Sequence, residues 1–76
     1  MRIYKNLSGN SDVAAFETGA DYIIVRFKEG EFREFTYDYA KAGYFAVETM
    51  KHLAMGGKGL GTYINTHMRD KYSKAA

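Results

Sequence analysis

A glycine-rich segment at residues 56–61 is the part of the sequence best suited to binding an anion. It reads Gly-Gly-Lys-Gly-Leu-Gly and directly precedes a run with helical periodicity. Backbone amides at the start of a helix lack an intrahelical partner, and the helix dipole favours negative charge there. Lys58 and Gly59 are therefore candidates for phosphate contact. A plain connector between two helices is the alternative, and the spacing is not that of a nucleotide-hydrolysing P-loop.

Basic side chains are concentrated in the second half of the chain. Residues 40–76 carry six Lys or Arg against two acidic residues, whereas residues 1–39 carry five against seven. This distribution favours an anionic partner, nucleic acid first, although an ordinary solvated surface would look similar. Cations neutralise phosphates and aromatic rings stack on unpaired bases. With Lys58 and Gly59, the nucleic-acid-binding candidates are Tyr63, Asn65, Arg69, Lys71 and Lys74.

Residues suited to catalysis are few. Ser11, Asn10 and His67 are the polar candidates, but no Gly-X-Ser-X-Gly elbow or oxyanion site accompanies them, so we expect no enzyme activity. A small phosphate-ligand or peptide-processing enzyme that uses Ser11 or His67 is the weaker alternative. The chain has no cysteine and only two histidines, so we expect neither a metal site nor a cofactor.

The elements that would position these residues begin with strands. At 76 residues the chain is long enough for one domain, and before Tyr39 its hydrophobic period is two. Strands are predicted at 13–17, 22–27 and 32–37, joined by glycine-containing turns into an antiparallel meander. Residues 2–4 are a candidate fourth strand. Phe27, Phe35 and Tyr37 are expected in the core.

Two helices are predicted after the strands. From Ala40 to Ala54 the apolar residues form one stripe, with Tyr44 and Phe45 off its centre, so at least one of these two should cover a sheet margin or face solvent. A second helix is expected from about Leu60 to Tyr72. Its packed side should contain Leu60, Tyr63, Ile64, His67, Met68 and Lys71. The predicted fold is thus α+β, with both helices packed on the sheet, and we expect a cytoplasmic protein with no membrane segment.

Several motifs together resemble the KTSC-domain family. The segments at 7–13 and 24–30, the Phe35 and Tyr37 pair, and the segments at 50–54, 57–60 and 63–72 keep that family's order and spacing. The motif positions carried over are Ser8, Asn10, Ser11, Gly59, Leu60, Tyr63, Ile64, Asn65 and Tyr72. The resemblance implies a small α+β bacterial or phage protein with a suspected nucleic-acid role and no catalytic residues. Gly61 departs from expectation, because a better helix former would suit the start of a helix.

Two functional hypotheses follow. The first is a nucleic-acid-binding module for RNA or single-stranded DNA that contacts phosphates through the basic second half. The second is a protein-interaction or self-associating module that uses an exposed sheet edge together with Tyr44 and Phe45, and a homodimer is one form of it.

Overall fold

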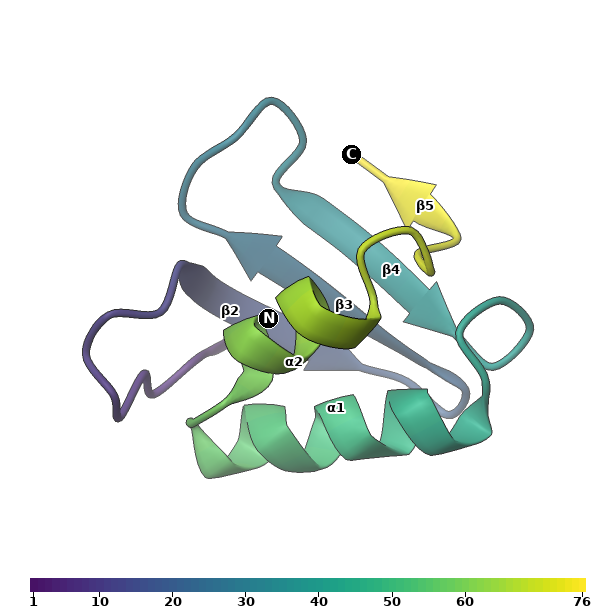
Figure 1. Cartoon of the computed structure of the whole chain (residues 1–76), viewed down its shortest axis with the longest axis horizontal. Coiled ribbons are helices and arrows are strands. Elements are labelled where there is room, and N and C mark those ends of the chain that lie inside the picture. Colours follow the sequence, from purple (N-terminus) through teal and green to yellow (C-terminus); the bar gives the residue numbers. More distant parts are fainter.

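The computed structural model describes residues 1–76 and contains a five-stranded antiparallel sheet with two helices in front of it (Figure 1). The strands pair in chain order, β1-β2-β3-β4-β5. In sequence order the elements are β1 (Arg2–Ile3), β2 (Val13–Thr18), β3 (Tyr22–Phe27), β4 (Glu34–Asp38), α1 (Tyr44–Gly56), α2 (Leu60–His67) and β5 (Lys74–Ala75). The α+β prediction is confirmed, including the fourth strand at the N-terminal end. Neither helix has the length and apolar character that a membrane crossing requires.

Alternation along the central strands separates a buried face from an open one. Ile23 pairs with Tyr37 and Val25 with Phe35, so these side chains share the face under the helices. Ile23, Val25 and Tyr37 are almost fully buried, while Phe27 and Phe35 are half-buried against the core. The predicted core positions are therefore confirmed for Tyr37, and the two phenylalanines lie at the core margin.

A β-bulge alters β2 next to its start. Val13 pairs with Phe27 and Ala15 with Arg26, so Ala14 is the additional residue. Bulges of this kind redirect side chains without ending the strand pairing. Val13 and Phe16 both enter the core as a result, although they are three residues apart. The carbonyl of Ala14 accepts a hydrogen bond from the Tyr4 amide at 3.0 Å.

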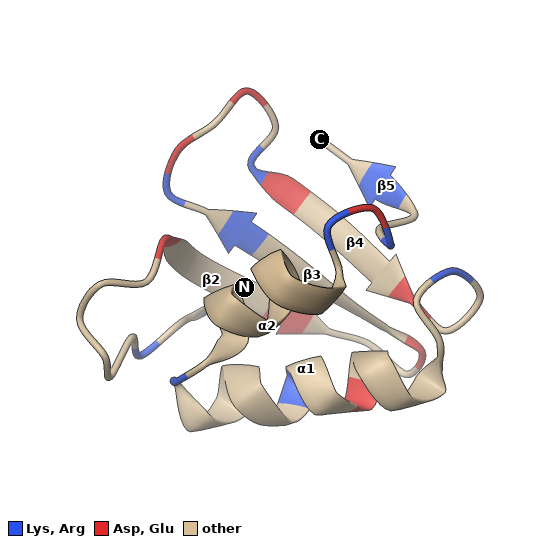
Figure 2. Ribbon diagram, in the orientation of Figure 1, with Lys and Arg blue, Asp and Glu red and all other residues tan.

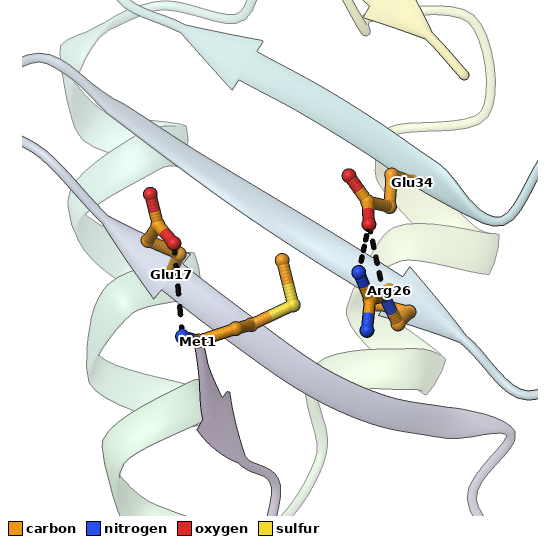
Figure 3. A network of polar contacts seen from close by, with 4 residues as sticks. All are labelled: Met1, Glu17, Arg26 and Glu34. Carbon is orange, nitrogen blue, oxygen red and sulfur yellow. Dashed lines mark hydrogen bonds and ion pairs between the residues drawn. The ribbon is translucent and has the colours of Figure 1, made fainter.

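The second face of the sheet has no helix over it. Figure 3 views the sheet from this side, with the helices behind the strands. Two ion pairs lie here: Arg26 with Glu34 between neighbouring strands, and the Met1 ammonium with Glu17 at 3.8 Å. Exposed pairs of this type stabilise a fold only weakly, so we assign them to the solvated surface.

Helix α1 begins later than the sequence predicted. The expected start was Ala40, but the helix begins at Tyr44. Residues 38–42 instead form a turn in which the Lys41 amide donates to the Asp38 side chain and the Ala42 amide to the Asp38 carbonyl. Gly43 then has φ of 95°, a conformation that interrupts helical geometry and that glycine adopts without strain. The predicted stripe is confirmed by the burial of Ala46, Val47, Met50 and Ala54.

Helix α2 is shorter than predicted, and a strand was missed. The helix ends at His67 instead of Tyr72, because Met68 has φ of −120° and leaves the helix. The Tyr72 ring packs edge-on against Phe35 at 4.9 Å between centroids. The Ser73 amide then donates to the Thr36 carbonyl, which begins the pairing of β5 with β4. Tertiary contacts with β4 therefore end the helix where the sequence has no glycine or proline.

A polar network connects α1 to the sheet margin. The Tyr39 hydroxyl donates to Glu48 at 2.6 Å, and the Lys51 ammonium lies 3.0 Å from the same carboxylate. Lys51 also donates to the carbonyl of Gly19, in the turn between β2 and β3, at 2.8 Å. The hydrogen bond to Glu48 raises the pKa of Tyr39 to about 12, with burial as the second cause. The same bond, followed by Lys51, lowers the pKa of Glu48.

This network predicts a loss of stability at alkaline pH. The pKa of Tyr39 in the folded chain, about 12, lies above the unfolded value of about 10. Its contribution should be complete below pH 10 and disappear as the pH rises to 12. Chemical unfolding across that interval should show a smaller decline for Glu48→Gln than for the parent chain. Burial also raises the pKa of Tyr37 to about 12, so part of the decline should remain.

The control for this experiment is Tyr22→Phe. Tyr22 has no hydrogen-bonded carboxylate partner, so its variant should decline between pH 10 and 12 as much as the parent does. An equal decline in Glu48→Gln and Tyr22→Phe would contradict the role of the Glu48 contact.

Candidate nucleic-acid interface

A small polar cavity lies between the start of α2 and the loop that precedes β2. Its volume is about 130 Å³ and none of its lining side chains is hydrophobic. It is lined by Ser8, Asn10, Ser11, Asp12, Gly59, Gly61, Thr62 and Asn65. Five of the motif positions from the sequence, Ser8, Asn10, Ser11, Gly59 and Asn65, therefore meet in one place although they come from two distant segments.

The close approach of these segments depends on Gly61. A Cβ atom at this position would lie 3.1 Å from the Ser11 hydroxyl oxygen and 3.4 Å from a carboxylate oxygen of Asp12. The first distance is shorter than an ordinary van der Waals contact, so Ser11 would have to shift slightly, whereas the second is an ordinary contact. The glycine that looked unfavourable for a helix start is therefore explained by packing, since it lets the first turn of α2 contact residues 11–13.

The loop before β2 is held in shape by its own short polar side chains. The Asn6 side-chain oxygen accepts a hydrogen bond from the Ser11 amide at 3.0 Å, and Ser11 in turn accepts one from the Val13 amide at 3.2 Å. The Leu7 amide donates to the Gly57 carbonyl at 2.8 Å, which fixes the loop to the α1–α2 connector. Such contacts are typical of turn-forming Asn and Ser residues. They leave Ser8 and Asn10 exposed at the cavity.

The amides at the start of α2 are only partly available. The Leu60 amide already donates to the buried Tyr4 hydroxyl at 3.2 Å. The amides of Gly61 and Thr62 make no hydrogen bond within the chain. Two free donors therefore remain at the positive end of the helix dipole, and both residues line the polar cavity.

A second hollow, the aromatic groove, continues from the polar cavity along α2. It has a volume of about 200 Å³ and lies between α2 and the β3–β4 hairpin. Its lining consists of Asp12, Phe27, Glu29, Phe32, Phe35, Tyr37, Ile64, Asn65 and Arg69. Phe27 and Phe35 pack edge to face at 5.6 Å, and Phe32 is half exposed beside them. The groove thus combines aromatic rings with charged and amide side chains.

Asp12 is the residue common to the hollows in this region. It lines the polar cavity, the aromatic groove and a shallow third hollow formed with Lys28 and Glu29. Its carboxylate takes part in none of the ion pairs of the chain. Asn65 lines both the polar cavity and the aromatic groove. These two side chains join the hollows into one continuous polar and aromatic surface.

The basic candidates do not gather into one patch. Lys58 precedes α2, whereas Arg69, Lys71 and Lys74 follow it, and a helix of eight residues is about 12 Å long. Figure 2 shows basic segments on the two sides of α2. Acidic segments lie in the turn between β3 and β4 and at the start of β2. Arg69 lines the aromatic groove, but Lys58, Lys71 and Lys74 line none of the hollows described above. Cations therefore flank the surface without covering it.

Two side chains of the predicted second helix differ from their expected environment. His67 and Lys71 were expected on the packed side, but both are exposed: His67 is the last residue of α2, and Lys71 lies beyond the end of the helix. The His67 ring lies 4.9 Å from that of Tyr63, which is half-buried against the core. His67 is at the opposite end of α2 from Ser11 and Gly61, and it lines neither hollow. Tyr63 is likewise absent from both linings.

No family model matches the chain, and searches of curated proteins and of solved structures find no match either. The likeness to KTSC-domain proteins therefore rests on the sequence motifs alone. The candidate surface is defined by its geometry.

Sequence reasoning missed the acidic and aromatic part of the surface. Phe27 and Phe35 were interpreted as core, which is half correct, and Phe32, Glu29 and Asp12 were not singled out for binding. The signal that was available is the position of Asp12 beside the Ser-Gly-Asn-Ser motif. That position alone does not indicate that the loop faces α2.

The packing at Gly61 predicts an unusual response to alanine. Gly→Ala within a helix ordinarily stabilises a protein by about 0.5–1 kcal/mol. Gly61→Ala should give no gain or a loss, because its Cβ would push against the Ser11 hydroxyl at 3.1 Å. Gly56→Ala is the matched control, since Gly56 ends α1 and no atom lies within 4 Å of the place that its methyl group would occupy. Urea unfolding of both variants tests this, and equal stabilisation by both would contradict the packing explanation.

Proposed function

We propose that the chain binds single-stranded nucleic acid, RNA or DNA, along α2. The observation that carries the proposal is the continuity between the polar cavity and the aromatic groove through Asp12 and Asn65. Aromatic faces and amide side chains are the groups that hold unpaired bases, and amides at a helix start hold phosphates. The resemblance to KTSC-domain proteins agrees with such a role.

The proposed path of the strand runs the length of α2. A phosphate would meet the free amides of Gly61 and Thr62, with Lys58 close to the start of the helix. A base would enter the aromatic groove beside Phe32 and Asn65, and Arg69 would contact the next phosphate or the base itself. The length of α2, about 12 Å, is sufficient for contact with a few nucleotides.

Charge supports binding only moderately under this proposal. Lys58 lies beside the surface and Arg69 lines the aromatic groove, but Asp12 and Glu29 line the same groove. We therefore assign most of the affinity to base contacts and about two phosphate contacts to the cations. For single strands this number gives a slope of about −1.4 in a plot of log affinity against log salt.

Fluorescence anisotropy with short labelled RNA and single-stranded DNA tests the proposal. Phe32→Ala should weaken binding several-fold, because stacking of one base contributes about 1–3 kcal/mol. Arg69→Ala should weaken binding and make the salt dependence shallower. Lys41→Ala is the charge-matched control, because Lys41 is exposed in the turn before α1, away from both hollows, and its variant should bind as the parent does. Absence of binding at low salt would end the proposal.

Self-association is the second candidate, and the exposure of α1 favours it. Tyr44 is 66% exposed and Phe45 79% exposed, as the sequence predicted. They line a shallow hollow with Glu48, Thr49, His52 and Leu53 on the outer side of α1. Glu48 is already bound to Lys51 and Tyr39, so pairing of two such faces would bury no free carboxylate. The sheet edges are less suited, since β1 and β5 have two residues each and short edge strands resist pairing.

Sedimentation across a concentration series tests this candidate. A dimer that forms through α1 should be lost in Phe45→Ser and retained in Ile3→Ser, where an equally exposed apolar residue is removed from the edge strand β1. Loss in Ile3→Ser alone would assign association to the sheet edge. A monomer at every concentration would contradict self-association altogether.

A further inference from the structure

The aromatic groove contains hydrogen-bond acceptors and donors within one small space. Asp12 and Glu29 supply carboxylate oxygens, which accept hydrogen bonds, while Arg69 supplies a guanidinium, which only donates. Asn65 can do both. A pocket for a drug-sized ligand has a volume of about 300–1,000 Å³, so a groove of about 200 Å³ suits a group of the size of one base.

We propose that this groove recognises guanine. Guanine is the base whose donors and acceptors match the polar groups that line the groove. Its ring N–H and exocyclic amino group are adjacent donors that can share the two oxygens of one carboxylate, Asp12 or Glu29. Its O6 and N7 atoms are adjacent acceptors that suit the guanidinium of Arg69, which is the pairing that arginine makes most often with a base. The rings of Phe32 and Phe35 supply the stacking surface.

The other bases match the groove less well. Uracil presents its one ring N–H between two carbonyl oxygens, so a carboxylate that approaches it meets like charge. Adenine and cytosine each present one amino group beside a ring acceptor, which leaves the second carboxylate oxygen unpaired. A carboxylate oxygen that loses its water to a base without gaining a donor is destabilised, so a site built around carboxylates discriminates against these three bases.

This inference rests on the proposed binding of single strands, and it is tested by base substitution in an otherwise constant oligonucleotide. The probes are a short labelled oligouridine and the same strand with one central guanosine, adenosine, cytidine or inosine. We expect the guanosine strand to bind about tenfold more tightly than oligouridine, which is within the discrimination that one bidentate base contact provides. Inosine lacks the exocyclic amino group and should lose most of this gain.

Two variants locate the preference in the groove. Glu29→Gln and Asp12→Asn should reduce the guanosine preference, measured in each variant as the ratio of its affinities for the guanosine strand and for oligouridine. Glu31→Gln is the matched control, because Glu31 lies in the same turn between β3 and β4 but does not line the groove. Its variant should keep the full preference. Glu29 and Glu31 are both exposed, so neither substitution should prevent folding.

The outcomes separate the inference from the proposal beneath it. Equal binding of all strands would overturn guanine recognition and leave single-strand binding in place, whereas absence of binding by every strand would remove both. If Glu29→Gln and Asp12→Asn keep the guanosine preference as Glu31→Gln does, the assignment of this preference to the groove is overturned.

Guanosine monophosphate as a competitor identifies the source of the base. Displacement at the same concentration as the oligonucleotide indicates a free nucleotide, and displacement only at much higher concentration indicates a strand.

Discussion

The contact between the first turn of α2 and residues 11–13 is the constraint on which the rest of the candidate surface depends. It is tight at position 61, because a Cβ there would lie 3.1 Å from the Ser11 hydroxyl oxygen and in van der Waals contact with Asp12 at 3.4 Å. With the glycine in place, the loop before β2 and the start of α2 enclose the polar cavity between them. The β-bulge at Ala14 lies directly after this loop, and it directs the Val13 side chain into the core.

The electrostatics of this surface are mixed, and this narrows what can bind. Free amides at the start of α2 favour an anion, but the unpaired carboxylate of Asp12 lies beside them. A simple anion would gain from the amides and lose from Asp12. A ligand that carries both donors and acceptors can satisfy each group in turn. Nucleotides have this character, because an anionic phosphate is linked to a base with N–H donors.

The strands and the buried stripe of α1 could be predicted from the sequence because they depend on local periodicity. Ile23, Val25 and Phe27 recur at every second position of a run rich in β-branched and aromatic residues, and Ala46, Val47, Met50 and Ala54 recur at helical spacing. The end of α2 could not be predicted, since Tyr72 leaves the helix to pack on Phe35 and no glycine or proline marks the change. The predicted environment of Lys71 was wrong for the same reason, because Lys71 lies beyond the end of the helix. The motif residues of the site were identified, but their meeting depends on a contact between segments about fifty residues apart in sequence.

The sheet and the candidate surface depend on contacts at different separations along the chain. Strands β1 to β4 pair in chain order with no helix between them, so this part of the sheet forms from contacts between adjacent segments, whereas β5 joins β4 only after both helices. The candidate surface instead joins the loop after β1 to α2. The hydrogen bond from the Leu60 amide to the Tyr4 hydroxyl holds these two segments together. Local opening of α2 would therefore remove the surface and leave the hydrogen bonds between β2, β3 and β4 intact. In such an open form the chain would keep most of its sheet and have no binding site, so a ligand would act on the molecule chiefly by holding the helix closed.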